Sequence, residues 1–292
     1  MTETIENSQL SKVLSVCIIG KPNAGKSTLL NRIIGQKISI VTPKVQTTRS
    51  IITGIITIDG VQMILFDTPG IFEPKKRLEK AMVRCAWSSI NGADEVVVII
   101  DSEKKIDEQT LKIIGRLKEL SIRFVILLNK IDRESTHIEV NKQIIQEFSP
   151  EAIFFEISAL KGDGIDKFQK YLLSKAKEGH WHYDKDDLTN LPIRFLASEI
   201  VREQLFLSLD QELPYNLTVE SESWKEQPDG SAKVSQVIIV TREAHKSIIL
   251  GKGGAMIKKI GIKARENIEN LSGQKIHLFL FVKVRKNWQE NP

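Results

Sequence analysis

The sequence has 292 residues, 41% of them hydrophobic, which is enough for about two domains with cores of their own. Its 42 lysines and arginines outnumber the 37 acidic residues, and the formal net charge of +5 favours a polyanionic partner. Two cysteines exclude a disulfide framework, the polar start MTETIENSQLSK predicts no signal peptide, and the apolar runs are too short to cross a bilayer, so we expect a soluble, cytoplasmic protein.

Residues 1–178 alternate short apolar runs with helical patterns. The run at 13–20 predicts a buried strand that leads into a helix beginning in GKSTLLNRII. The runs at 51–58 and 61–67 flank Asp59-Gly60, a hairpin signal. Further buried strands are predicted at 95–100, 123–129 and 152–158. We therefore expect an α/β domain with a mostly parallel sheet, helices on both faces and one antiparallel edge strand.

The second half of the chain has a different pattern. The polar, irregular stretch 179–192 predicts an interdomain linker. The order that follows in 193–292 is helix, strand, strand, helix, glycine loop, helix and strand, which predicts a smaller α+β domain. Its strands are expected near 217–224, 232–241 and 275–284.

The stretch GKPNAGKS (20–27) fits the phosphate-binding pattern G-x-x-x-x-G-K-[ST] and lies between a predicted strand and a helix. Gly20 and Gly25 allow the backbone to curl around a β-phosphate, at a helix start whose dipole favours anions. Lys26 can reach the β- and γ-phosphates, and Ser27 can offer its hydroxyl to Mg²⁺. The other predicted nucleotide contacts in this loop are Lys21, Pro22, Asn23, Ala24 and Thr28.

NKID (129–132) ends a predicted strand, at the sheet edge where ligands bind in such folds. Asp132 can accept hydrogen bonds from N1–H and N2–H₂ of guanine, which adenine lacks. Asn129 can hold the loop and meet the base edge, while Lys130 can lay its stem over the sugar or ring. ISAL (157–160) ends the next strand, where the Ala159 N–H can donate to guanine O6. The predicted contacts of this last segment are Ser158, Ala159 and Leu160, and the predicted ligand is GTP or GDP.

DTPG (67–70) follows the second hairpin strand. Asp67 is placed to hold Mg²⁺ through water, and the Gly70 N–H to sense the γ-phosphate. In QTTRS (46–50), a threonine hydroxyl can complete the Mg²⁺ shell when triphosphate is bound, which would make 36–50 and 67–80 switch segments. The pattern leaves Thr47 and Thr48 both open, and Thr48 is favoured. The predicted catalytic set is Lys26, Thr48, Asp67 and Gly70.

GKGG (251–254) lies between two predicted helices and matches the G-x-x-G loop of KH domains. In such a loop the glycines allow close approach to a sugar-phosphate backbone, and about four nucleotides are clamped beside it. Lysines and arginines around the loop exceed the acidic residues, as expected of a nucleic-acid surface. The predicted RNA contacts are Gly251, Lys252, Gly253, Gly254, Lys258 and Lys259. The residues predicted to form core and groove floor are Ile248, Ile249, Ile257 and Ile260.

The order GKPNAGKS, TTR, DTPG, NKID, SAL resembles that of translation-factor-class GTPases. Together with ILGKGGAMIKKIGIKARE (249–266) and VKVRKNW (282–288), it is similar to the Era family of bacterial GTPases, which carry a P-loop GTPase domain and a C-terminal type II KH domain. The resemblance implies binding to the 3′ end of 16S ribosomal RNA, a role in 30S subunit assembly and rRNA maturation, and a loose peripheral association with the inner membrane. We expect a monomer.

Ile71 stands where Ras-like GTPases carry the glutamine that orients the attacking water, so hydrolysis must be arranged otherwise. Some family members bind K⁺ beside the phosphates through a loop asparagine, which is Asn23 here. Two alternatives remain open at this point. One is an RNA-binding module with a slowly exchanging structural nucleotide. The other is a GTPase of tRNA modification, although that family carries a terminal cysteine motif and no cysteine follows Cys85 here.

Overall fold

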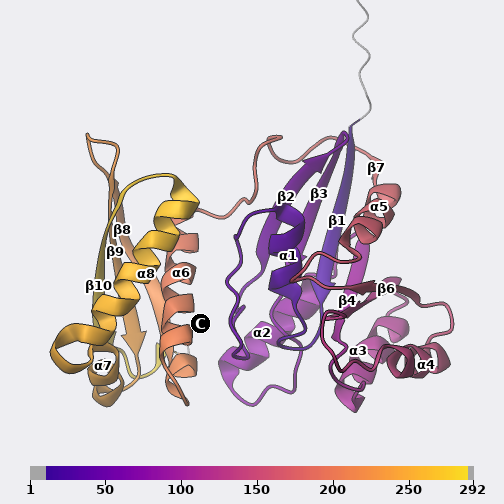
Figure 1. The fold of residues 1–292 in the computed structure, drawn as a ribbon, viewed down its shortest axis with the longest axis horizontal. Helices are drawn as coiled ribbons and strands as arrows, with labels where there is room; N and C mark the ends of the chain where they lie inside the picture. Colours follow the sequence, from indigo (N-terminus) through magenta and orange to yellow (C-terminus); the bar gives the residue numbers. More distant parts are fainter. Residues whose placement is uncertain (1–10, 289–292) are drawn as a thin grey trace, which may run out of the picture. The chain divides into compact units, whose positions relative to one another are not determined.

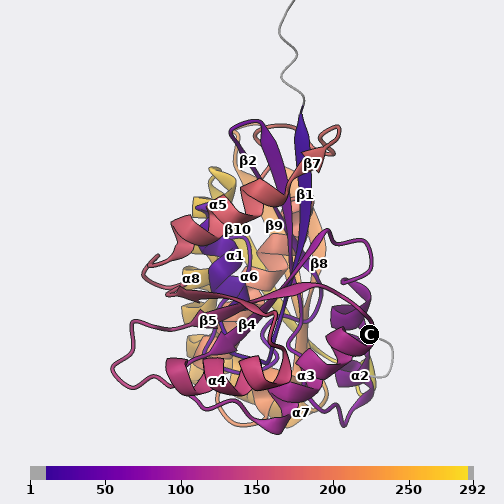
Figure 2. The same cartoon turned by 90° about the vertical axis from the view of Figure 1, so that its right-hand side faces the viewer.

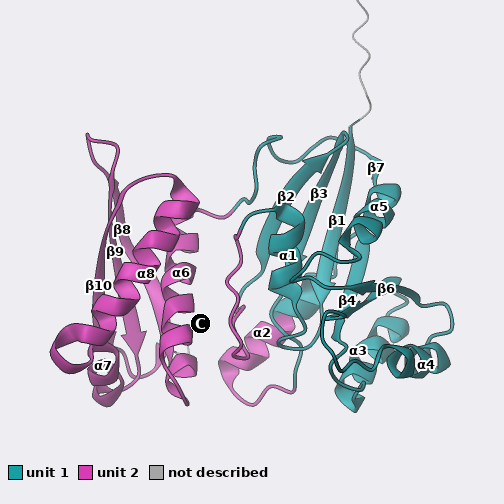
Figure 3. Ribbon diagram, in the orientation of Figure 1, with its two compact units in different colours: residues 1–36, 50–72, 85–190 teal, residues 37–49, 73–84, 191–292 magenta. Residues whose placement is uncertain are grey.

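The computed structural model describes residues 11–288, which form two compact units. The first comprises the described residues up to 36 together with 50–72 and 85–190, drawn in teal in Figure 3. The second comprises 37–49, 73–84 and the residues from 191 onward, drawn in magenta. No helix in the described range is both long and apolar enough to span a membrane.

The first unit is a seven-stranded, mostly parallel sheet with helices on both faces (Figure 1). The mostly parallel sheet and its six main strands are as predicted, whereas the two-residue strand β7 was not predicted. Its strands are β1 (Lys12–Ile19), β2 (Ile52–Ile58), β3 (Val61–Asp67), β4 (Glu95–Asp101), β5 (Phe124–Asn129), β6 (Ile153–Ile157) and β7 (Lys177–Glu178). Its helices are α1 (Lys26–Ile34), α3 (Glu108–Glu119), α4 (Ile138–Phe148) and α5 (Ile165–Lys175), with α2 (Arg77–Ser88) divided between the two units. The strand order is β2-β3-β1-β4-β5-β6, and the short β7 pairs with the start of β1.

The central strands are continuous apolar runs because both faces of the sheet are covered. Helix α1 contacts β2 and β3, and α5 contacts β1 and β6. Helices α2, α3 and α4 contribute to an apolar cluster with β1, β4 and β5. Helices α3 and α4 lie side by side in Figures 1 and 2. The predicted hairpin is present: β2 runs antiparallel to β3, and Asp59 and Gly60 both have positive φ, as a type I′ turn requires.

The stretch predicted to be a linker is bonded to the first unit over much of its length. Gln62 is fully buried on β3, and its side-chain oxygen accepts hydrogen bonds from the backbone N–H of His182 (2.8 Å) and Tyr183 (3.1 Å). Its amide nitrogen donates to the Tyr183 carbonyl (2.8 Å), and the Ile55 N–H donates to the Leu188 carbonyl (2.8 Å). A buried amide needs such partners, so this part of the chain is held against the sheet.

The second unit contains α6 (Ile193–Ser208), β8 (Leu217–Glu226), β9 (Ala232–Val240), α7 (Glu243–Leu250), α8 (Ala255–Ser272) and β10 (Ile276–Val284), with 3₁₀ turns at Leu213–Asn216 and Lys252–Gly254. The strand order is β10-β9-β8, with β9 parallel to β10 and antiparallel to β8. Helices α6 and α8 pack on one face of this sheet. The expected small α+β domain is confirmed.

Candidate functional site

The loop at 20–28 joins β1 to α1, and its path requires glycine at two positions. A Cβ on Gly25, which has φ 105°, would lie 2.1 Å from the Asn129 side-chain nitrogen. A Cβ on Gly20 would lie 2.4 Å from the Ile99 carbonyl oxygen. The loop can therefore pass close to β4 and β5 and enter α1 at Lys26, leaving the N-terminus of α1 to face an anion.

Lys26 is the buried cation of this loop, with 5% of its surface exposed. Its Nζ donates to the carbonyl oxygens of Lys21 (2.8 Å) and Gly20 (3.2 Å), so the side chain curls back over its own loop. Burial lowers the pKa of Lys26 from its ordinary 10.5 to about 8, although the nearby Asp67 carboxylate opposes this change. A phosphate would supply the negative charge that this buried ammonium lacks.

We expect Lys26→Met to stabilise the nucleotide-free protein at pH 7, by up to about 3 kcal/mol, because it removes a desolvated charge. The folded chain releases the Lys26 proton at a lower pH than the unfolded chain does. The wild-type penalty is therefore full below pH 8 and fades as the pH rises towards 10.5. Urea denaturation of both proteins at pH 7 and pH 10 measures the difference between their unfolding free energies, which should be smaller at pH 10.

Lys21→Met is the matched control for that experiment, because Lys21 lies in the same loop but is partly exposed and paired with Asp107. It is not expected to stabilise the fold. A Lys26→Met gain that stayed equal at the two pH values would show that the buried charge is not its cause.

Two predicted Mg²⁺ ligands lie together. The Ser27 hydroxyl donates to Asp67 Oδ2 (2.6 Å), and Asp67 is fully buried at the end of β3. Within residues 11–288 no three His, Cys, Asp or Glu side chains gather as a metal site. One hydroxyl and one carboxylate nevertheless suit Mg²⁺, which takes its other ligands from phosphates and water. Of the two candidate threonines, Thr47 donates to the Lys44 carbonyl (2.7 Å) inside its own loop and Thr48 is buried, and the choice of Thr48 as the third ligand stays a prediction.

Asn129 connects the two loops that were predicted to hold the nucleotide. Its Nδ2 donates to the Ala24 carbonyl (2.7 Å), as expected of a residue that holds the loop. Its Oδ1 accepts the Ala159 N–H (2.9 Å), the group expected to donate to guanine O6. The Ala159 N–H therefore binds Asn129 here and not a base, because β5 and β6 are neighbours and Asn129 ends beside the 158–160 loop.

Asp132 is positioned by Ser158, whose hydroxyl donates to Asp132 Oδ1 (2.6 Å). This hydrogen bond lowers the pKa of Asp132, so the carboxylate is anionic at neutral pH and can only accept hydrogen bonds. Lys130 Nζ is paired with Asp101 (2.6 Å) and Glu103 (3.2 Å), which fixes the lysine stem beside the same loop. The arrangement suits a ligand edge that carries two adjacent N–H donors, such as guanine.

The DTPG segment closes against the phosphate loop. A Cβ on Gly70 would lie 2.7 Å from the Pro22 ring and 2.8 Å from its nitrogen, so only glycine fits there. The Ile71 N–H donates to the Gly20 carbonyl (3.0 Å), and the Ile71 side chain, 5% exposed, joins the core around Cys17. Ile71 is therefore unsuited to orient water by its position as well as by its chemistry.

Residues 37–49 of the predicted switch segment 36–50 belong to the second unit, and no pattern in the sequence predicts this. The buried Glu203 carboxylate of α6 accepts from the Val41 N–H (2.8 Å) and from Lys37 Nζ (2.6 Å). Arg49 donates to the Leu217 carbonyl (2.7 Å), and its guanidinium lies 5.7 Å from the centroid of the Trp288 ring. These contacts fix the segment that carries Thr48.

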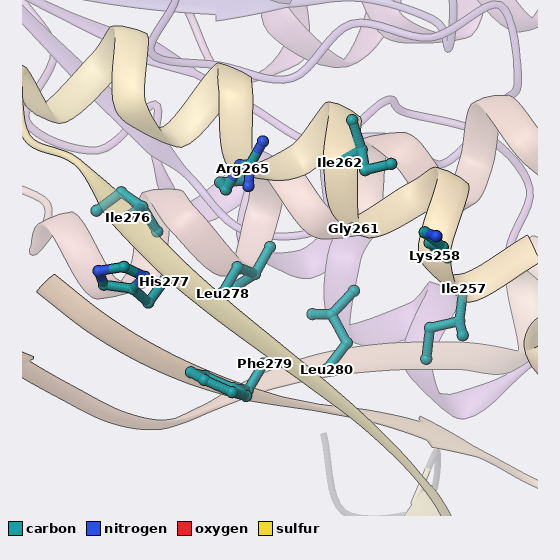
Figure 4. A pocket seen from close by; sticks show the side chains of 10 residues that line it. All are labelled: Ile257, Lys258, Gly261, Ile262, Arg265, Ile276, His277, Leu278, Phe279 and Leu280. Atoms are coloured by element: carbon teal, nitrogen blue, oxygen red, sulfur yellow. The ribbon is translucent and has the colours of Figure 1, made fainter. Parts of the chain in front are cut away.

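Three residues of the G-x-x-G loop are glycines in conformations that other residues rarely adopt. Gly251, Gly253 and Gly254 have φ 71°, 59° and 79°. Beside it lies a groove of about 410 Å³ between α8 and β10 (Figure 4). The groove is lined by Ile257, Lys258, Gly261, Ile262, Arg265, Ile276, His277, Leu278, Phe279 and Leu280. None of these ten residues, all within the described range, is acidic.

Of the predicted RNA contacts in α8, Lys258 lines this groove, while Lys259 is exposed outside it. The four isoleucines divide. Ile249 and Ile260 are fully buried core residues and Ile257 lies in the groove, as predicted. Ile248 is 54% exposed, so its assignment to core or groove floor was wrong. Adjacent helix positions point about 100° apart, and Ile249 takes the inward direction in α7.

Both units of this chain resemble known protein families. Residues 15–130 match the family described as 50S ribosome-binding GTPase, and residues 212–289 match the KH domain family. The GTPase Era of Rickettsia bellii is 58% identical over 283 residues, which cover 97% of this chain and 96% of that protein. A crystal structure of Era in complex with MgGDPNP and nucleotides 1506–1542 of 16S ribosomal RNA has a TM-score of 0.92 and 37% identity, covering 97% of this chain and 96% of that one.

A second crystal structure, of an Aquifex aeolicus Era variant bound to GDP·AlF4⁻, has a TM-score of 0.91 and 37% identity over 96% of both chains. Because these matches extend over the KH unit as well as the nucleotide unit, they set aside a tRNA-modification GTPase, and a merely structural nucleotide does not fit a family that hydrolyses GTP. This chain belongs to the Era family of GTPases.

Proposed function

We propose that this GTPase binds the 3′ end of 16S ribosomal RNA through the groove between α8 and β10, and acts in 30S subunit assembly and rRNA maturation. The observation that supports this most strongly is the likeness, over 97% of the chain, to an Era structure that holds both MgGDPNP and that RNA segment. The protein would act as a monomer in the cytoplasm, with a loose peripheral association with the inner membrane.

In this proposal the first unit works by positioning and charge. Lys26 and the loop N–H groups would stabilise negative charge on the phosphates, and Ser27, Thr48 and Asp67 would hold Mg²⁺, which would add positive charge beside the phosphate oxygens. Asp132 selects guanine. The side chain after DTPG is apolar, so attack by water depends on groups other than a side chain at that position, and we expect slow turnover without RNA.

The test is GTP hydrolysis by the purified full-length protein, with and without a short RNA of the 16S 3′ end and with a scrambled RNA as control. We expect the 3′-end RNA to bind more tightly than the scrambled RNA and to raise turnover by about tenfold, a typical size for coupling between two sites. Equal binding of the two RNAs would contradict the proposed target. Tight binding without any change in turnover would contradict the coupling.

A monovalent cation is part of the proposal, because Asn23 lies in the phosphate loop and the residue after DTPG cannot help the attack. A K⁺ ion held by Asn23 beside the phosphates would supply positive charge where negative charge develops. We expect turnover to be severalfold higher in KCl than in NaCl at equal ionic strength, and Asn23→Ala to abolish the difference. Equal turnover of the wild type in the two salts would remove K⁺ from the mechanism.

A further inference from the structure

The edge strand β10 carries two exposed aromatic side chains on one face. Side chains alternate along a strand, and Leu278 and Leu280 point towards the helices and pack against the core of the second unit. Phe279 and Phe281 point the other way, and 44% and 47% of their surfaces are exposed. Because β10 is the outer strand of its sheet, both rings stand at the molecule's surface.

The two rings differ in their surroundings. Phe279 is one of the residues that line the groove, and Phe281 is not. In Figure 4 Phe279 extends from β10 on the side away from Leu278 and Leu280, at the outer rim of the groove. Lys233, on the neighbouring strand β9, places its Nζ 5.1 Å from the centroid of the Phe279 ring. The groove therefore ends in an exposed aromatic ring that has a cation beside it.

We propose that Phe279 is a stacking platform for one nucleobase of single-stranded RNA, beyond the nucleotides that lie along the Gly251–Gly254 loop. This inference rests on the proposed function, since it names a further contact residue of the same RNA site. The apolar groove leads to the ring, and Lys258 and Arg265 on its helix side attract the phosphates. Lys233 can pair with the phosphate of the stacked nucleotide, and every base offers a flat face to an aromatic ring.

The competing occupant is a protein strand that adds to the free edge of β10. The charges favour RNA, because the groove lining contains the cations Lys258 and Arg265 and no acidic residue. A protein strand would pair with the backbone along the whole edge and would use Phe281 as much as Phe279. RNA that leaves the groove meets Phe279 alone, and this difference makes Phe281 a matched control.

The experiment measures binding of the full-length protein, with Mg²⁺ and a non-hydrolysable GTP analogue, to a labelled RNA of the 16S 3′ end. Phe279→Leu keeps an apolar side chain but removes the aromatic face, and we expect it to weaken binding by about tenfold, the usual loss for one base–aromatic stack. Phe279→Trp should bind at least as tightly as the wild type. Phe281→Leu, an equally exposed position on the same face, should change the affinity less than twofold.

A second readout separates stacking from a structural effect. In RNAs that carry 2-aminopurine at successive positions, one position should lose fluorescence on binding to the wild type and regain it with Phe279→Leu. If the wild type binds this RNA no better than a scrambled one, the proposed function fails and this inference with it. If the wild type binds but Phe279→Leu has no effect, or if Phe281→Leu costs as much, the stacking proposal alone is wrong.

Discussion

Asp132→Asn is expected to lower the affinity for GTP by about a thousandfold and to raise the affinity for xanthosine triphosphate. The carboxylate can accept both guanine N–H donors, and each charge-assisted hydrogen bond contributes about 2 kcal/mol. The amide oxygen of asparagine can accept one of these hydrogen bonds, but its NH₂ group then faces the other guanine donor, and two donors in contact repel each other. Xanthine carries an oxygen where guanine carries the amino group, so the amide matches it. Titration of the wild type and the variant with GTP and with xanthosine triphosphate measures both changes in affinity.

Ser158→Ala is the control for this substitution, because it removes the 2.6 Å hydrogen bond to Asp132 Oδ1 and leaves the carboxylate in place. It should cost severalfold in affinity and keep the preference for GTP. If Asp132→Asn lowered the affinities for GTP and xanthosine triphosphate to the same extent, Asp132 would be acting through the structure of the loop and not by recognising the base.

Gly253→Asp is expected to weaken binding of the 16S 3′-end RNA by about a hundredfold and to abolish any RNA stimulation of hydrolysis. The new carboxylate would face the RNA phosphates, and like charges in contact cost several kcal/mol. The new side chain has room, since a Cβ there meets no atom within 4 Å, and at φ 59° aspartate is among the residues that adopt the left-handed region at the lowest cost. RNA binding and RNA-stimulated turnover are the two measurements.

Gly230→Asp is its matched control, because Gly230 also has a positive φ (78°) and open space around its Cβ, but lies in the turn between β8 and β9. It should leave RNA binding unchanged, and both variants should lose a similar unfolding free energy of about 1 kcal/mol, because each replaces a glycine of positive φ. Gly251 is less suitable, because a Cβ there would lie 2.8 Å from that of Met256 and would disturb the fold. Equal loss of RNA binding in both variants would show a general charge effect, not a contact at the G-x-x-G loop.

The sequence by itself determined the two domains and the order of their elements. The buried strands are continuous apolar runs, the hairpin turn is Asp59-Gly60, and both glycine-rich loops have fixed spacings between glycine and lysine. These signals are local, since they depend on side-chain period and on backbone angles that few residues adopt. The residues Gly20, Ser27, Asp67 and Asn129 could therefore be named as candidate site residues before any coordinates.

The tertiary structure decided what depends on residues far apart in the chain. Asn129 meets Ala24 and Ala159 because parallel strands end at one edge of the sheet, which no sequence period encodes. Ile71 enters the core, and residues 37–49 join the second unit through Glu203 and Arg49. Phe279 and Phe281 are alike in the sequence pattern, and only the packing of α8 against β10 places one of them in the groove.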